Sequence, residues 1–93
     1  MDVYKELEFF EERKILDEEL RSRLDDGEDR TSIHIDFENR LWRMKKENVK
    51  RDSPKYRALE MELNSYRRAV TFGYYEKKGW HLKHSGEWIR KEN

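Results

Sequence analysis

Apolar residues recur at spacings of three and four along residues 53–75, the clearest helical pattern in the chain. The row consists of Tyr56, Leu59, Leu63, Tyr66 and Val70. Ser53 can cap the first turn, and Pro54 suits the first helical position because its missing N–H would be unpaired there anyway. We therefore predict a helix over residues 53–75 whose apolar face packs against another surface.

Residues 2–25 also predict a helix, but with two apolar rows instead of one. The first row is Val3, Leu7 and Phe10, and the second is Phe9, Leu16, Leu20 and Leu24. Asp2 can cap this helix, and Gly27 in the charged stretch 25–30 can end it. Because the rows lie more than a quarter turn apart, the helix should touch two neighbours. We expect a partner subunit near its start and the chain's own core near its end.

Residues 32–49 predict the helix between these two, capped by Thr31 or Ser32. Its two rows are Phe37, Leu41, Met44 and Asn48, and Ile35, Trp42 and Val49. A strand over residues 32–37 is an open alternative, because Ile33, Ile35 and Phe37 alternate with polar residues. The short connection at residues 52–54 predicts that the second and third helices form an antiparallel hairpin.

The tail, residues 76–93, has a different period. Gly79 and Gly86 bracket a segment that can fold as a small hairpin, and a short terminal helix is the alternative. Its apolar residues are Trp80, Leu82, Trp88 and Ile89. The two tryptophans are expected to cover the open end of a helical core. The predicted fold is all-α, an antiparallel helical hairpin or a three-helix arrangement with a short C-terminal aromatic hairpin or tail, in one domain of residues 1–93.

The composition leaves little apolar material for a core. Leu, Ile, Val and Phe contribute only 19 of 93 residues, while 45% of residues are charged. Disordered chains share this feature, but three Trp, five Tyr and a formal net charge of zero favour a folded domain. A domain this short buries only about 60% of its unfolded surface. We therefore expect a homodimer, in which a second copy covers more of the apolar surface.

The zero net charge conceals a separation along the chain. Residues 1–29 carry 12 acidic and 5 basic residues, a net charge of −7, while residues 30–93 carry 9 acidic and 16 basic residues, a net charge of +7. Either the two parts lie against each other, within or between subunits, or one of them faces a partner of opposite charge.

The absence of cysteine excludes disulfides and thiolate metal sites and fits a reducing compartment. The first 14 residues are acidic where a signal peptide would be basic, and no apolar run approaches the ~20 residues that cross a bilayer. We therefore expect a cytoplasmic protein.

Catalytic and metal-binding patterns are weak in this sequence. His81, His84 and Glu87 are spaced three residues apart, but three candidate ligands in a turn-rich segment are more typical of surface histidines than of a metal site. The sequence contains no glycine-rich phosphate loop and no nucleophile motif. We therefore expect no enzymatic activity, no cofactor and no metal.

We expect instead a small protein-interaction or regulatory module that sequesters or recruits a protein partner through a charged helical surface. Aromatic residues dominate the energetics of such surfaces. The candidate partner-binding residues are Tyr4, Phe9, Glu11, Glu12, Trp42, Phe72 and Tyr75. The size and charge density would suit an accessory or inhibitor protein of the kind that bacteriophages use to redirect host machinery.

Nucleic-acid binding is the alternative hypothesis. Cations are concentrated in residues 40–57, and the tail combines further cations with aromatic rings that could stack on bases. The candidate residues are Arg40, Arg43, Lys46, Lys50, Arg51 and Lys83. This hypothesis is less favoured because the acidic first helix would repel a polyanion and the domain as a whole is not basic.

Overall fold

The computed structural model describes residues 3–70 and 73–91 of the chain. The elements are three long helices, α1 (Val3–Asp25), α2 (Arg30–Lys46) and α3 (Pro54–Ala69), a single turn α4 (Tyr74–Lys77), and two strands, β1 (Trp80–Leu82) and β2 (Trp88–Arg90). The strands pair antiparallel, with His81 opposite Ile89. The prediction of a helical fold with a short C-terminal aromatic hairpin is confirmed.

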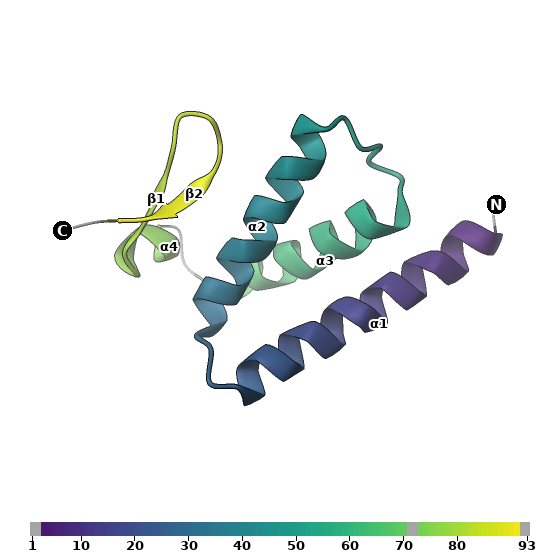
Figure 1. The fold of residues 1–93 in the computed structure, drawn as a ribbon, viewed down its shortest axis with the longest axis horizontal. Coiled ribbons are helices and arrows are strands. Elements are labelled where there is room, and N and C mark those ends of the chain that lie inside the picture. The colour runs from purple at the N-terminus through teal and green to yellow at the C-terminus, as the bar shows by residue number, and fades with distance from the viewer. Residues whose placement is uncertain (1–2, 71–72, 92–93) are drawn as a thin grey trace.

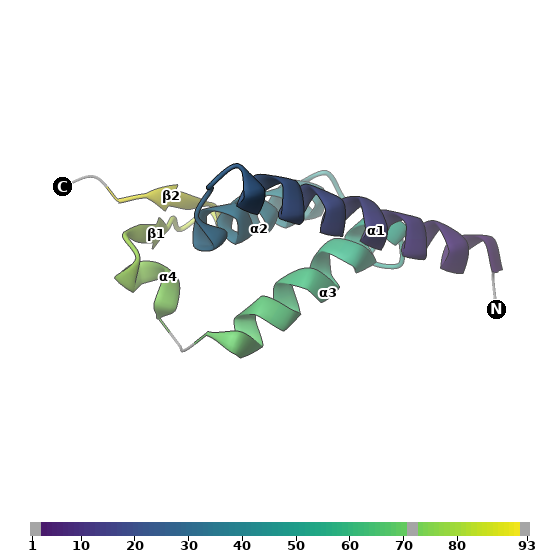
Figure 2. The same ribbon diagram turned by 90° about the horizontal axis from the view of Figure 1, so that it is seen from below.

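The three long helices form an elongated arrangement (Figure 1), in which α3 slopes away from the level of α1 and α2 (Figure 2). α1 and α3 run side by side in a similar direction, and α2 runs obliquely back between their ends. The first turns of α1 extend beyond α3, while the hairpin lies at the opposite end of the long axis, as both views show (Figure 2). A change in the hairpin is therefore far from the start of α1.

α2 begins earlier than predicted. Its cap is Asp29, whose carboxylate accepts a hydrogen bond of 3.1 Å from the backbone N–H of Ser32. Residues 32–37 are helical, so the alternative of a strand there is wrong. The predicted end at residue 49 is also wrong, because Asn48 adopts a left-handed conformation with φ 59° that ends the helix after Lys46.

α3 begins as predicted but ends earlier. The Ser53 hydroxyl accepts a hydrogen bond of 3.3 Å from the Tyr56 backbone N–H, and Pro54 is the first helical residue. Val70 then adopts an extended backbone with φ −118° and ψ 156°, and Gly73 has a left-handed φ of 77°. The prediction of one helix over residues 53–75 is therefore wrong, and residues 74–77 form a separate turn.

Two clusters of buried side chains hold these elements together. The larger one joins the three long helices through Leu16, Leu20, Ile33, Phe37, Leu41, Tyr56, Leu59 and Leu63. The smaller one joins α2 and α3 to the tail through Ile35, Tyr66 and Tyr75, with Trp80 and Trp88 packed against them. The tail tryptophans thus cover one end of the three-helix arrangement, as expected from the sequence.

The hairpin is fixed to α2 by polar contacts as well as by packing. The Asn39 amide donates to the Trp88 carbonyl and accepts from the Trp88 backbone N–H, both at 2.8 Å. The Trp42 indole N–H donates to the Ser85 carbonyl at 2.8 Å. Gly86 lies directly against this indole, and a Cβ atom there would be only 2.9 Å from Trp42 Cδ1. The turn therefore requires a glycine at this position.

Candidate protein-interaction surface

The exposed face of α1 carries a row of large apolar side chains. Val3, Leu7 and Phe10 are 65%, 57% and 63% exposed, and we call these three residues the outer row. On another side of the same helix, Phe9 is buried, as are Leu16 and Leu20. The two apolar rows of the sequence therefore face different surroundings, and only the second is covered by this chain.

Charged residues border the outer row on both sides. Glu6 and Arg13 lie on the edge next to α3, where the Arg57 guanidinium lies 3.4 Å from the Glu6 carboxylate and Arg13 donates to the Ala58 carbonyl at 3.4 Å. The helical period places Tyr4 and Glu11 on the other edge, and both side chains are exposed. The surface therefore combines an apolar centre with a charged rim, which is the usual composition of a protein-binding patch.

The structure distributes the predicted partner-binding residues over different surroundings. Phe9 is only 7% exposed, with the Arg57 guanidinium 4.4 Å from its ring centre, and Tyr75 is only 8% exposed. Trp42 is half-buried beneath the hairpin. Phe72 lies outside the described residues. The structure brings together Tyr4 and Glu11 beside the outer row, and Glu12 lies half-buried on the side nearer the core.

Ion pairs between the acidic and basic parts of the chain neutralise several of its charges. Arg40 donates to the Glu19 carboxylate, with Nη1 2.8 Å from Oε1, and also contacts Asp36 at 3.0 Å. The hydrogen bond from Arg40 lowers the pKa of the Glu19 carboxyl group, and Arg23 adds to this effect. Lys5 and Asp52 pair at 3.2 Å. Part of the charge separation is therefore satisfied within the chain.

The residues of the nucleic-acid hypothesis fall into two groups. Arg40 is held by carboxylates, and Arg51 lies 3.6 Å from Glu60. The others are exposed and make no ion pair with any residue in the described part of the chain: Arg43, Lys46, Lys50 and Lys83. The Lys46 ammonium lies 5.1 Å from the centre of the Trp42 ring. Four cations thus remain open on α2, the following loop and the hairpin.

A buried polar cluster around His34 was missed by the sequence reasoning. The His34 ring is fully buried and stacks on Tyr66, with ring centres 3.9 Å apart. Its Nδ1 lies 3.0 Å from the Arg30 carbonyl oxygen and its Nε2 lies 3.3 Å from the Glu62 carboxylate. Both ring nitrogens of His34 therefore have a hydrogen-bonding partner. The hydrogen bond from His34 lowers the pKa of the Glu62 carboxyl group.

The surroundings of His34 show that this cluster is structural. The Thr31 hydroxyl and the Tyr66 hydroxyl are 2.9 Å apart and buried, which pairs the other polar groups beside the ring. One signal in the sequence points to this burial, since His34 stands between Ile33 and Ile35 in the first turns of a helix. A histidine at such a position is more often a satisfied core residue than a catalytic base.

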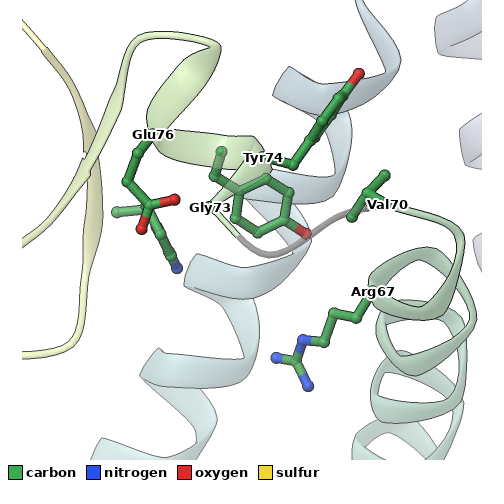
Figure 3. A pocket seen from close by; sticks show the side chains of 7 residues that line it. Arg67, Val70, Gly73, Tyr74 and Glu76 are labelled. Atoms are coloured by element: carbon green, nitrogen blue, oxygen red, sulfur yellow. The ribbon is translucent and has the colours of Figure 1, made fainter.

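An aromatic cavity of about 240 Å³ lies where α3, α4 and β2 meet. It is lined by Arg67, Val70, Gly73, Tyr74, Tyr75, Glu76 and Trp88, of which Figure 3 labels five. Arg67 already forms an ion pair with Glu38, and the Tyr75 hydroxyl donates to the same carboxylate at 3.3 Å. Burial raises the pKa of Tyr75 well above its usual range. These groups therefore serve the junction between α2, α3 and the tail.

The residues of the weak metal pattern are not assembled into a site. Over residues 3–70 and 73–91, no three side chains of His, Cys, Asp or Glu are placed to hold a metal ion, so His81, His84 and Glu87 do not converge. Within the same ranges, no helix has both the length and the apolar character needed to span a membrane.

Comparisons with known proteins add no relative to this description. No protein-family model matches the chain. No curated protein and no solved structure matches it either. On the surface of the described residues, the outer row is a group of three large apolar side chains that are each more than half exposed.

Proposed function

We propose that this protein is a non-enzymatic protein-interaction module whose binding surface is the outer row with its charged edges. It acts by occupancy, because a preformed helix face covers a complementary protein surface and so sequesters or recruits its partner. An accessory or regulatory role fits this mode of action. The single observation that supports the proposal is the exposure of three large apolar side chains in register on one helix.

The spacing of the outer row suits helix-mediated recognition. Val3, Leu7 and Phe10 follow one another at four and three residues, so they project from one side of α1 as anchors for an apolar groove. Each side chain is more than half exposed, and covering it with a partner contributes about 1 to 2 kcal/mol. Three such anchors form a contiguous apolar patch, which is typical of an interaction site. Single apolar residues scattered over a surface are normal and do not indicate binding.

The proposal is tested by measuring how well the immobilised full-length protein and its variants retain a protein ligand. The immobilised protein is compared with Leu7→Glu and Phe10→Glu, and Met61→Glu on α3 serves as the matched control because Met61 is 49% exposed outside the outer row. A protein ligand should be retained by the wild type and the control and lost by both outer-row variants. Equal retention by all four proteins would contradict the assignment of the surface.

The four open cations support a second candidate function, which is binding of a nucleic acid. Phosphate contacts weaken steeply as salt rises. A gel shift with DNA or RNA that is lost on raising the salt, and is reduced in a Lys46→Ala, Lys50→Ala double variant, would favour this function. Retention of the shift in that variant would exclude these two lysines as phosphate contacts.

A further inference from the structure

We infer that the partner on the outer row is a second copy of this chain, bound so that the two α1 helices pair antiparallel. This inference rests on the proposed function, because it names the occupant of the same surface. The pair would be isologous, with the same residues contributed by both copies around a two-fold axis.

The outer row has the spacing of a seam between two paired helices. Val3, Leu7, Phe10 and Lys14 follow one another at four, three and four residues. At 1.5 Å per residue the seam is about 16 Å long. Lys14 closes it, because the aliphatic stem of a lysine can cover an apolar neighbour while its ammonium group stays in water.

The polar residues at the edges of the seam are complementary in an antiparallel pair. An antiparallel register that sets Leu7 against the partner's Phe10 also sets Val3 against the partner's Lys14. Residues on the same edge then face each other across the pair, so Glu6 approaches the partner's Arg13 on one side. On the other side, Tyr4 approaches the partner's Glu11, where a phenol can donate to a carboxylate. The two-fold axis repeats both contacts.

The parallel alternative lacks this complementarity. In a parallel pair each edge meets the opposite edge of the partner, which places Glu6 beside the partner's Glu11. Two carboxylates at such a contact repel each other, and parallel helices also align their dipoles unfavourably. The charges therefore select the antiparallel orientation.

The outer row and its edges are accessible to a second copy. Glu6 lies 3.4 Å from the Arg57 guanidinium, and its side chain is about 40% exposed. Arg13 donates to the Ala58 carbonyl at 3.4 Å and is half-buried, so both side chains can also form hydrogen bonds with a partner. Residues 3–14 carry four acidic and three basic side chains, so two copies of this segment meet with little net repulsion. Most of the acidic surplus of residues 1–29 therefore lies outside this segment.

Sedimentation equilibrium tests the existence of the dimer. The mass should rise from 11.6 kDa towards twice that value between about 5 and 500 μM, since a small interface is typical of weak association. Leu7→Glu and Phe10→Glu should each weaken association about 30-fold or more, and Met61→Glu should leave it unchanged. Circular dichroism confirms that each variant keeps its helices. A wild-type mass of 11.6 kDa at every concentration would overturn the inference.

Disulfide exchange tests the orientation, because the natural chain has no cysteine. Leu7→Cys and Phe10→Cys proteins are mixed and oxidised, and the products are separated by mass. The antiparallel pair predicts a mixed disulfide between the two variants, whereas disulfides between identical variants alone would overturn the register. A monomeric protein whose outer-row variants nevertheless lose another protein ligand would refute the dimer and leave the proposed function standing.

Discussion

Replacing Gly86 by alanine should release the hairpin from α2. Gly86 has a φ of +106°, a conformation that is unfavourable for an L-residue by about 1 to 2 kcal/mol. The new methyl group would also lie 2.9 Å from Cδ1 and 3.0 Å from Nε1 of Trp42. Both distances are below normal contact, and the obstacle is a ring that is itself hydrogen-bonded to Ser85.

The size of the effect follows from how the clash is relieved. Overpacking costs about 1 to 3 kcal/mol if the ring stays in place. If the ring moves instead, the chain loses the Trp42 to Ser85 hydrogen bond, which contributes about 1 kcal/mol. With the backbone contribution added, the loss of hairpin stability should be about 2 to 5 kcal/mol if the ring stays in place and about 2 to 3 kcal/mol if it moves.

Gly79 provides the matched control. Its φ is +93°, close to that of Gly86, but nothing lies within 4 Å of a Cβ atom built there. Gly79→Ala should therefore lose only the backbone contribution of about 1 to 2 kcal/mol. The difference between the two variants isolates the contact with Trp42.

Hydrogen exchange observed by NMR measures both variants. The indole N–H of Trp42 and the backbone amide of Trp88 should exchange much faster in Gly86→Ala than in Gly79→Ala, while amides of α1 and α3 keep their protection. Equal exchange in the two variants would refute the reasoning, because it would mean that Trp42 does not hold the turn.

Three further predictions follow from the packing of the core and its polar groups. Leu63→Ala should lower the free energy of unfolding by about 3 kcal/mol in urea titrations, because Leu63 is fully buried. Asn39→Ala removes both 2.8 Å hydrogen bonds to Trp88, so exchange of the Trp88 amide should quicken about tenfold or more, and unchanged exchange would contradict the docking. Glu62→Gln should cost about 1 kcal/mol near neutral pH, because it removes the charge beside His34. The pKa of Glu62 is lowered in the folded state, so the wild type should lose this advantage as the pH falls below the pKa of an ordinary glutamate. A difference in unfolding free energy between wild type and variant that stays constant down to pH ~2 would contradict this prediction.

Local signals in the sequence were sufficient to predict that the three long helices exist and to locate the N-terminal cap of one of them. Ser53 followed by Pro54 located the start of α3, because both residues act through their immediate backbone neighbours. The start of α2 was misplaced because Asp29, Thr31 and Ser32 are all acceptable caps, and local chemistry does not choose among them. The apolar period also continued to Val70, and only the tail packing against Tyr66 explains why the chain turns there.

The candidate surface required tertiary information for a similar reason. Phe9 and Phe10 are adjacent residues of the same type, so composition cannot tell which is an anchor and which is core. The two rows predict that the helix touches two neighbours, with a partner subunit near its start, but both phenylalanines lie near that start. Phe9 is the predicted partner-binding residue, and its side chain is only 7% exposed in the single chain.

The choice between the two rows depends on contacts that are remote in sequence. Phe9 is buried because its direction on α1 is that of Leu16 and Leu20, which the apolar face of α3 covers. Once α3 occupies that side, the helical period leaves Phe10 pointing away, and no other described element reaches the outer row. The same packing that completes the core thus leaves Val3, Leu7 and Phe10 uncovered. Burial of these three side chains by a second copy must therefore be measured as self-association, because the free energy of unfolding of the single chain does not include it.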